Sequence, residues 1–336
     1  GIFFNNNFVA STVTVTGSSF VLFGGSATVT NNYFYSEGDN PHYVQQNTSI
    51  ARSTWNFSLN GIETNTQGTI TDSGDIILIP INVTSSGSFK NNIHKGARSN
   101  SMFLSLQGGV NNVSSAAVMD NNTVYYDSGT ASEKGCFRIG ETYAGRPDMW
   151  GSLRNNLCVA NLSDSNGAIL RDNQPALGLG PQKVSSGGFN GYFNLGSTLY
   201  QGTGTYGGSD VSVNPDFIDV TRGLTAWDTS LGGPGTSFNA RTELLKLNAG
   251  SAYNPAYNVD ALRTYFFTGF TPKAASLIGA GFDGSDLGAV AIYTSSAAVA
   301  AAATTQPLRR NLSPVGIGRS SPSDPIIRRR LQWLGR

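Results

Sequence analysis

The chain has 336 residues and a formal net charge of +1, which gives no overall electrostatic basis for binding nucleic acid. Charged residues make up only 13%, whereas apolar residues reach 39% and include 18 Phe and 13 Tyr, which excludes charge-rich disorder. The 41 Gly and the abundant Ser, Thr and Asn instead favour an all-β protein whose surface is kept polar by hydroxyls and amides.

The chain opens directly on a strand-like apolar run, Ile2-Phe3-Phe4, with no Met and no signal peptide before it. We therefore expect Gly1 to be a processed or truncated start. The longest weakly apolar stretch, residues 289–303, is Ala-rich and too short to cross a bilayer, so no membrane span is expected.

Twin-asparagine corners followed by an apolar or aromatic residue recur along the body of the chain. Neighbouring copies lie 25 to 34 residues apart, except for one gap between Asn32 and Asn92 that would hold two turns. Irregular self-similarity at this period predicts a solenoid. The copies are Asn6-Asn7-Phe8, Asn31-Asn32-Tyr33, Asn91-Asn92-Ile93, Asn121-Asn122-Thr123-Val124, Asn155-Asn156-Leu157 and the degenerate Asn190-Gly191-Tyr192-Phe193.

The residue choice at these corners predicts a right-handed parallel β-helix. Asn tolerates the left-handed backbone conformation that a sharp turn requires, and stacked Asn amides can form a hydrogen-bonded ladder. The alternative, a β-sandwich with hairpin turns, requires Asn-Gly pairs, and only Asn60-Gly61 and Asn190-Gly191 fit that pattern. The predicted core residues are Val13, Val15, Val29, Ile77, Ile79, Leu104, Leu106, Val124, Ile139, Val159 and Ile169.

The two cysteines, Cys136 and Cys158, are too few to form a disulfide framework. We predict that they stack as buried thiols on neighbouring turns, with a disulfide as the less favoured alternative. The pair therefore does not reveal the redox compartment.

Helical periodicity is scarce and falls within a closing region, residues 211–292. The two helical candidates are residues 240–248 and 259–267. Three other parts of this region carry recognisable motifs: Val213-Asn214-Pro215-Asp216-Phe217-Ile218-Asp219 with Arg222-Gly223-Leu224, Ala275-Ser276-Leu277-Ile278-Gly279-Ala280-Gly281, and Asp286-Leu287-Gly288-Ala289.

These motifs resemble the closing segments of right-handed β-helix proteins of the pectate-lyase-like superfamily. The resemblance covers about residues 2–292, and it departs where Gly279 stands in place of the usual Asp. It implies a β-helix over residues 1–292 with a C-terminal closure. It does not imply a chemistry, since the superfamily holds polysaccharide lyases, glycoside hydrolases, adhesins and phage tailspikes.

Acidic residues offer weak candidates for catalysis. A glycosidase needs two facing carboxylates, and Asp120, Glu141 and Asp172 flank strands where successive turns could align them. Acidic residues on a β-helix are more often solvated turn positions, so the prediction leans away from an enzyme. The two histidines, His42 and His94, are likewise expected on solvated turns.

Metal and cofactor signals are also weak. The acidic turns at residues 72–75, 207–210 and 283–286 could offer oxygens to Ca²⁺, but none has the full calcium-loop pattern. We therefore predict ordinary turns and no cofactor, with calcium as a weak alternative.

Aromatic residues near the turns are candidates for glycan binding, because flat rings on a polar solenoid can stack on sugars. An equally weighted alternative is that they are buried against a long loop or a neighbouring subunit. The candidates are Tyr33, Tyr35, Tyr125, Tyr126, Tyr143 and Trp150.

The composition changes after residue 292. Residues 293–306 are rich in Ala, Ser and Thr, as in a linker, and residues 307–336 form a basic, Pro-containing arm. Trp and Leu interleaved with Arg favour a protein partner over nucleic acid or an incidental crystal contact. The predicted docking residues are Arg309, Arg310, Ile326, Ile327, Arg328, Arg329, Arg330, Leu331, Trp333 and Leu334.

Together these features predict a structural or receptor-facing β-helix of a larger assembly, namely a bacteriophage tail spike or fibre or a capsid decoration. The expected partners are other copies of the chain and a cell-surface polysaccharide, and the expected location is the virion or the extracellular space. The alternatives from other classes are a secreted polysaccharide lyase or glycoside hydrolase and a bacterial surface adhesin.

Overall fold

The computed structural model divides the chain into two units, Gly1–Tyr293 and Thr294–Arg336, and the residues it describes all belong to the first unit. All structural statements below concern these residues. They are residues 2–11, 20–23, 26–36, 43–47, 53–64, 76–80, 85–96, 104–106, 115–126, 135–139, 150–172, 183–201, 203–206 and 209–289.

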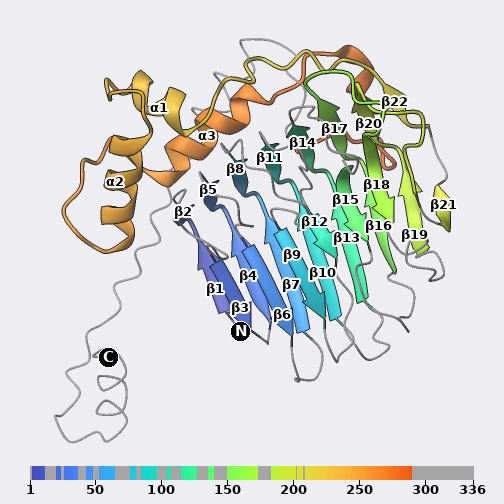
Figure 1. Cartoon of the computed structure of the whole chain (residues 1–336), viewed down its shortest axis with the longest axis horizontal. Helices are drawn as coiled ribbons and strands as arrows, with labels where there is room; N and C mark the ends of the chain where they lie inside the picture. Colours follow the sequence, from blue (N-terminus) through green and yellow to red (C-terminus); the bar gives the residue numbers. More distant parts are fainter. Residues whose placement is uncertain are drawn as a thin grey trace, which may run out of the picture. The chain divides into compact units, whose positions relative to one another are not determined.

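The strands form three sheets, here called sheets A, B and C, and every strand pair in the described residues is parallel (Figure 1). Sheet A contains β1 (Ile2–Asn5), β4 (Ala27–Thr30), β7 (Ser53–Ser58), β10 (Ser85–Lys90), β13 (Ser115–Asp120), β16 (Trp150–Arg154), β19 (Lys183–Gly188) and β21 (Thr203–Tyr206). Sheet B contains β2 (Phe8–Ser11), β5 (Tyr33–Ser36), β8 (Gly61–Thr64), β11 (Ile93–Gly96), β14 (Thr123–Tyr126), β17 (Leu157–Ala160), β20 (Gly191–Phe193) and β22 (Val211–Ser212). Sheet C contains β3 (Phe20–Phe23), β6 (Tyr43–Asn47), β9 (Ile76–Pro80), β12 (Leu104–Leu106), β15 (Gly135–Ile139) and β18 (Ala168–Asp172).

From β1 to β20 the chain enters sheets A, B and C in turn, so each strand pairs with the strand three places along the sequence. We call one such set of three strands a repeat. The prediction of an all-β protein with parallel strands and few helices is therefore confirmed. The arrangement is compatible with a parallel β-helix.

The corner between sheets A and B explains the twin asparagines. The first residue of each corner has a left-handed backbone, with φ of 57° to 59° at Asn6, Asn31, Asn91, Asn121 and Asn155. Asn adopts this conformation at little cost, because its short polar side chain can bond locally. In two further repeats other residues take the same conformation, and these are Leu59 and Phe189.

The second residues of the corners form a continuous amide ladder, and all of them except the half-buried Asn7 are buried. In the middle of the ladder, Asn92 donates from its backbone N and its Nδ2 to Asn122 Oδ1, at 3.1 and 3.0 Å. Its Nδ2 also donates to the carbonyl oxygen of Phe57, at 3.0 Å. The ladder members are Asn7, Asn32, Asn60, Asn92, Asn122, Asn156 and Asn190, with Asp210 as the last acceptor.

This ladder also includes the two Asn-Gly pairs. Asn60 fills the long gap between Asn32 and Asn92, since it accepts from Asn32 N at 2.9 Å and donates to Asn92 Oδ1. Asn190 occupies the same position near the other end. Both pairs are therefore corners between parallel strands, not hairpin turns.

An inner core fills the space between the three sheets, and rings from adjacent repeats stack within it, as for Phe57 and Phe89 with centroids 6.0 Å apart. The predicted core residues Val29, Val124 and Ile169 belong to it, whereas Val159 is buried on the other face of sheet B. The remaining predicted core side chains lie outside the described residues. The inner core consists of Ala27, Val29, Phe34, Phe57, Ile62, Phe89, Met119, Val124, Tyr126, Cys136, Phe137, Leu153, Cys158, Ala160, Ile169 and Leu170.

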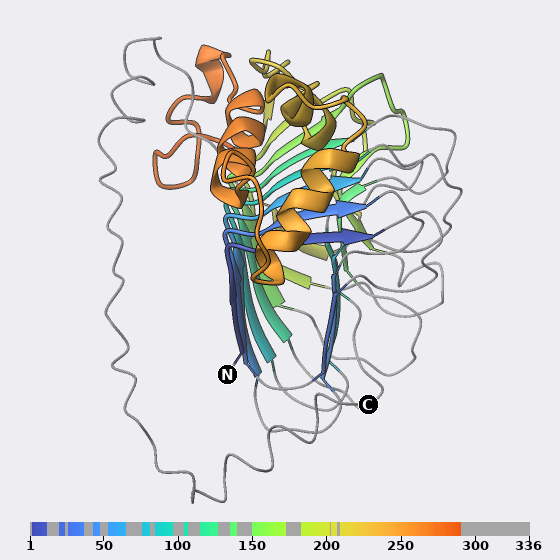
Figure 2. The same ribbon diagram turned by 90° about the vertical axis from the view of Figure 1, so that its left-hand side faces the viewer.

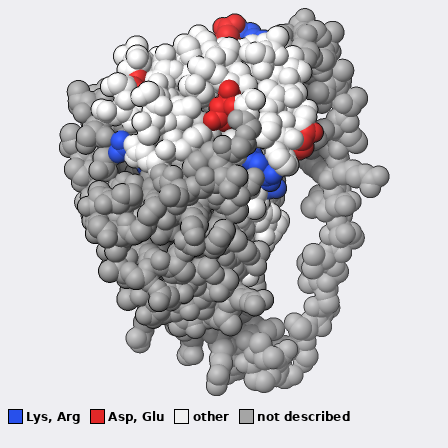
Figure 3. Space-filling view, turned by 90° about the vertical axis from the view of Figure 1, so that its right-hand side faces the viewer, with Lys and Arg blue, Asp and Glu red and all other residues white. Residues whose placement is uncertain are grey.

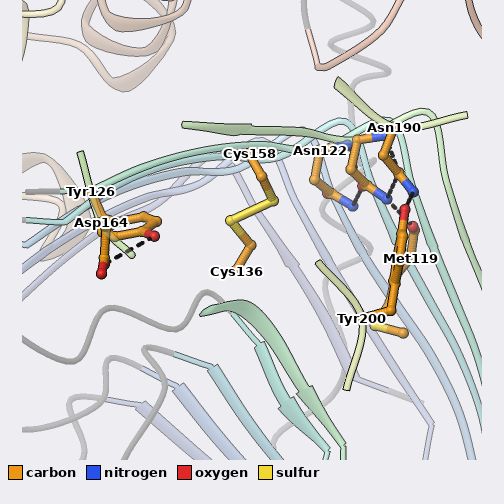
Figure 4. The surroundings of a disulfide bond; sticks show 9 residues. Met119, Asn122, Tyr126, Cys136, Cys158, Asp164, Asn190 and Tyr200 are labelled. Atoms are coloured by element: carbon orange, nitrogen blue, oxygen red, sulfur yellow. Dashed lines mark hydrogen bonds between the residues drawn. A yellow bond between two sulfur atoms is a disulfide. The ribbon is translucent and has the colours of Figure 1, made fainter. Parts of the chain in front are cut away.

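The prediction of separate cysteine thiols is wrong, because Cys136 and Cys158 form a disulfide inside the inner core (Figure 4). Cys136 lies on β15 of sheet C and Cys158 on β17 of sheet B. They belong to successive repeats, as expected, but they face each other across the interior with Cα atoms 6.2 Å apart, within disulfide range.

A C-terminal segment, residues 213–289, covers the outer face of sheet B (Figure 2). It contains α1 (Leu224–Ser230), α2 (Phe238–Asn248), α3 (Val259–Gly269) and the short 3-10 helix η2 (Ala275–Leu277). Helix α2 contacts β2, and α3 contacts β5 and β8. Both predicted helices are therefore confirmed as α2 and α3, while α1 was not predicted.

The outer core is the apolar layer between sheet B and this segment. In it Tyr33 meets Phe266 edge to face, with ring centroids 5.3 Å apart. Its buried members are Phe8, Tyr33, Tyr35, Ile93, Tyr125, Leu157, Val159, Leu224, Trp227, Ala240, Leu244, Tyr257, Val259, Leu262, Phe266, Phe270, Leu277 and Leu287.

The closing motifs have a structural role in this layer. Leu277 and Leu287 are fully buried, and Asp286 Oδ1 accepts from the backbone N of Gly279 at 3.0 Å. Gly279 has φ of 62°, a conformation that glycine adopts without steric cost. None of the helices in the described residues is both long and apolar enough to cross a bilayer.

Candidate functional site

A pocket of about 220 Å³ lies between sheet B and the beginning of the C-terminal segment. Its floor is one register row of sheet B: Tyr125 on β14 pairs with Val159 on β17, which pairs with Phe193 on β20. Because side chains alternate along a strand, residues in one row point to the same face. The floor is therefore a small aromatic and aliphatic platform.

The wall of the pocket comes from the beginning of the C-terminal segment, where Pro215, Phe217 and Val220 line it. The Phe217 ring is held edge to face against Tyr125 and Phe270, with centroids 6.2 and 5.4 Å away. These contacts fix the aromatic groups before any ligand arrives.

The rim of the pocket is polar and is formed by Asn161, Asn214 and Asp216, all exposed. Asn214 Oδ1 accepts from the backbone N of Asp216 at 3.0 Å, and Asp216 Oδ2 forms an ion pair with Lys273 Nζ at 3.1 Å. Asp216 also holds a left-handed backbone, with φ of 48°. These contacts fix the geometry of the rim.

The pocket lining can bind but shows no catalytic pair. Hydrolysis of a glycoside requires two carboxylic groups, and Asp216 is the one carboxylate among the lining residues. Figure 3 shows scattered charged side chains among neutral ones on the described surface of one face. Amides and aromatic rings are the groups this site offers.

Of the three carboxylates proposed for catalysis, Asp120 is the one whose side chain the structure describes. Asp120 ends β13 in sheet A and is buried; its Oδ1 accepts from Ser152 Oγ at 2.9 Å and from Arg154 N at 3.2 Å. Asp172 ends β18 in sheet C, and its side chain lies outside the described residues, as does all of Glu141. Asp120 and Asp172 therefore do not share a register row.

Four of the six aromatic candidates are buried: three lie in the outer core and Tyr126 lies in the inner core. Tyr33, Tyr35 and Tyr126 are fully buried, and Tyr125 is 9% exposed. Tyr126 points into the inner core, where its hydroxyl donates to Asp164 Oδ2 at 3.5 Å. Of these four, Tyr125 lines the pocket. The fifth, Tyr143, and the side chain of Trp150 lie outside the described residues.

A buried polar cluster, here called the Glu63 cluster, ties sheet B to α1. Glu63 Oε2 accepts from Tyr33 Oη at 2.6 Å and from the backbone N of Leu224 at 2.7 Å. Lys95 Nζ lies 3.7 Å from Glu63 Oε1 and donates to the carbonyl oxygen of Arg222 at 3.2 Å. Burial, and then the negative charge of Glu63, raise the pKa of Tyr33 well above its ordinary value. The cluster is structural and no sequence motif pointed to it.

The histidine prediction is wrong for His94, which is fully buried on β11, in register with Ile62 and Val124 of the neighbouring strands. Its neighbours in this row belong to the inner core, so the position requires a side chain that fills space. His42 lies outside the described residues.

The acidic turn at residues 283–286 uses its carboxylates within the protein. Asp283 Oδ1 accepts from the backbone N of Ser285 and from Asn155 Nδ2. The pKa of Asp283 is lowered, first by its hydrogen bond with the Ser285 side chain and then by these contacts. Among the described residues no group of three or more His, Cys, Asp or Glu side chains is placed to hold a metal ion. The turn at residues 72–75 and the docking-arm residues 309–334 lie outside the described residues.

Sequence reasoning missed most of the pocket. Phe217, Asn214 and Asp216 stand within the motif that indicated chain closure, and nothing in that motif distinguishes a lining residue from a packing residue. Phe193 stands in the degenerate corner copy, where its aromatic character was the available signal.

Comparisons of the chain with known proteins found no relative. No protein-family model matches the chain, and neither a curated protein nor a solved structure matches it.

Proposed function

We propose that this chain is a right-handed parallel β-helix that serves as a structural, receptor-facing component of a larger assembly of the virion type. Its body faces a glycan or another surface receptor, and its C-terminal arm, residues 307–336, anchors it to further copies of the chain. The proposal places it in the virion or the extracellular space.

One observation carries the non-catalytic part of the proposal. The pocket on sheet B combines aromatic and amide groups with a single lining carboxylate, Asp216, so it is suited to hold a ligand and not to cleave one. Asp120, the described catalytic candidate, is instead bonded to Ser152 and Arg154 of the next strand. These contacts support a scaffold in which carboxylates hold strands together.

The amide ladder supports a role in assembly. Seven asparagines and Asp210 connect the repeats in one hydrogen-bonded row, which makes the body a stiff support on which a binding surface can be displayed. Repeat proteins of this kind expose extended surfaces for binding partners.

The anchoring role is tested by deleting residues 307–336 and measuring the molar mass in solution. We expect the full chain to form oligomers and the truncated chain to be monomeric with unchanged thermal unfolding. A matched control removes eight residues of the linker, 296–303, and keeps the arm, so its oligomers should persist. An unchanged molar mass after removal of the arm would refute the anchoring role.

Catalysis is tested separately by incubating the full chain with acidic polysaccharides and following the ultraviolet absorbance of unsaturated products and the release of reducing ends. We expect neither signal to exceed a heat-denatured control. Product formation would replace this proposal with a polysaccharide lyase or a glycoside hydrolase.

A further inference from the structure

We propose that the pocket on the outer face of sheet B is a binding subsite for a single neutral sugar ring. The inference rests on the proposed function only in taking a glycan as the ligand, and it assigns that ligand to named residues. It also excludes a ligand class, the uronic acids, by charge.

The floor of the pocket has the spacing that a sugar ring needs. Tyr125, Val159 and Phe193 lie on three adjacent strands in one row, so the outer two are about 10 Å apart at their Cα atoms. Tyr125 and Val159 are buried, at 9% and 3% exposed, and close the bottom of the pocket, while the half-buried Phe193 supplies the apolar ring at its side. The C–H groups on one face of a pyranose are complementary to such a surface.

The rim supplies the polar contacts that a sugar's hydroxyls require. Asn161 and Asn214 each carry an amide that can donate and accept, and a sugar hydroxyl can do both as well. The contact from Asp216 N to Asn214 Oδ1 orients the Asn214 amide before binding. A few placed polar groups above an apolar floor are what ligand pockets of proteins share.

The charge at the rim selects against anionic sugars. Asp216 is the one lining residue that is charged near neutral pH, and its carboxylate is two-thirds exposed. Its partner Lys273 lies outside the lining, so a bound uronate would meet the negative end of the ion pair first. Neutral hexoses and N-acetylated sugars avoid this repulsion.

The size of the pocket limits it to one ring. Its volume of about 220 Å³ is below the range of roughly 300 to 1,000 Å³ that encloses drug-sized ligands. A ligand with about a dozen non-hydrogen atoms is expected to bind alone with a dissociation constant on the order of millimolar. Further rings of a longer glycan would extend into solvent. A repetitive glycan that binds several copies of the chain at once would have a higher overall affinity.

The experiment uses the full chain and a panel of single sugars observed by saturation-transfer NMR, with affinities from titration. The neutral probes are glucose, galactose, mannose, rhamnose and N-acetylglucosamine, and the anionic probes are glucuronate and galacturonate. We expect at least one neutral sugar to bind with a millimolar dissociation constant and both uronates to bind at least tenfold more weakly.

Two pocket variants, Phe193→Ala and Asn161→Ala, should each weaken the neutral sugar at least fivefold. Their matched controls are Phe282→Ala, which removes an exposed ring outside the pocket, and Leu162→Ala, which removes the exposed neighbour of Asn161; both should bind as the unaltered chain does. Thermal unfolding of each variant shows whether it is folded.

Asp216→Asn separates a binding role from a structural one. Asn tolerates the same left-handed backbone, and the change removes the rim charge, so neutral binding should persist while uronate binding rises severalfold. The proposal is overturned if no neutral sugar binds, if uronates bind equally well, or if folded Asn161→Ala and Phe193→Ala bind unchanged. The arm-deletion experiment is independent of these results, so the subsite can fail while the assembly role stands.

Discussion

The two faces of sheet B are stabilised by different kinds of contact. On the inner face, side chains pack against those of the next repeat: Phe34 on β5 is in register with Ile62 on β8, and it contacts Phe57 on β7 of sheet A with ring centroids 5.7 Å apart. On the outer face, contacts join residues far apart in the sequence: Arg263 Nη1 donates to Asn31 Oδ1 at 2.7 Å across 232 positions. The same strands thus carry a repeated set of contacts on one side and a unique set on the other.

The difference indicates how each face responds to damage. An inner contact recurs in each repeat, so its loss breaks a continuous row and leaves buried groups that no other segment can reach. An outer contact depends on the docking of one segment, residues 213–289, and its loss leaves the repeats themselves intact. The following predictions test that division.

The largest effect is expected from Asn122→Ala in the middle of the ladder. The change removes the donor to Phe89 O and to Asn156 Oδ1 and the acceptor of Asn92 N, all in a fully buried row. Unpaired buried polar groups cost about 1 to 3 kcal/mol each, so we expect the free energy of unfolding to fall by about 4 kcal/mol. Urea unfolding measures this value.

The neighbouring residue provides the control for the ladder. Asn121 has φ of 58° and is half-exposed, so Asn121→Gly keeps the corner conformation and should change stability by less than about 0.5 kcal/mol. Equal effects of the two substitutions would mean that the buried amide of Asn122 contributes no more than the half-exposed amide of Asn121, which would contradict a stabilising role for the ladder.

The next effect concerns the disulfide of the inner core. Cys136 and Cys158 are separated by 22 residues and join successive repeats, so Cys136→Ala with Cys158→Ala frees a loop in the unfolded chain. Loop-closure entropy predicts a loss of about 3 kcal/mol. Identical urea midpoints for the oxidised chain and the double variant would show that the bond contributes nothing.

The repeated structure behind the inner face could largely be predicted from the sequence. The twin asparagines predicted the corners, the stacking and the parallel strands, because each corner repeats the same requirement for a left-handed residue followed by an amide. Where the first Asn is replaced, as by Leu59 before Asn60, the pattern showed only a gap that would hold two turns, and no corner was assigned to Asn60. The backbone conformation is the same there, but the residue no longer reveals it.

The packing of the outer face could not be predicted from the sequence, and the reason is physical. Tyr33 and Tyr35 occupy outward positions on β5, where an exposed and a covered aromatic ring give the same sequence pattern. Which one holds depends on a segment some 200 residues later, and local spacing does not encode that contact. The pocket was missed on the same account, since half of its lining comes from that segment.

On the outer face the largest effect should come from Glu63→Ala. The change leaves Tyr33 Oη and Leu224 N without their acceptor in a buried site, and we expect a loss of about 2 kcal/mol. A Cβ added at Gly223 would collide with the Glu63 carboxylate, so Gly223→Ala should destabilise the unaltered chain more than the Glu63→Ala chain. Additive losses in a double-mutant cycle would exclude this contact.

Alkaline pH should lower the free energy of unfolding through two buried tyrosines, one on each face of sheet B. Burial raises the pKa of Tyr33 and of Tyr126, and the charges of Glu63 and Asp164 add to it, so both stay neutral in the folded chain. In the unfolded chain they ionise at about pH 10. Their contribution is therefore complete below about pH 10, and each loses about 1.4 kcal/mol per pH unit above it.

The test compares urea unfolding at about pH 8 and about pH 11 for the unaltered chain, Tyr33→Phe and Tyr126→Phe. Each variant should lose less stability between the two pH values than the unaltered chain does, because it removes one ionising group. An unchanged pH dependence in either variant would show that the corresponding tyrosine ionises in the folded state.

The smallest effect is expected at the rim of the pocket, where Lys273 and Asp216 form an ion pair at 3.1 Å with side chains that are 39% and 68% exposed. Such pairs contribute about 0.5 kcal/mol, so Lys273→Ala should barely move the urea midpoint, and the effect should vanish in about 0.5 M salt. The double-mutant cycle with Asp216→Asn isolates the pair. Asp216 and Lys273 both belong to the C-terminal segment, so the pair joins the beginning of that segment to a later part of it. A coupling that survives high salt would mean that this contact stabilises the fold of the segment, in addition to the Glu63 cluster that holds the segment to sheet B.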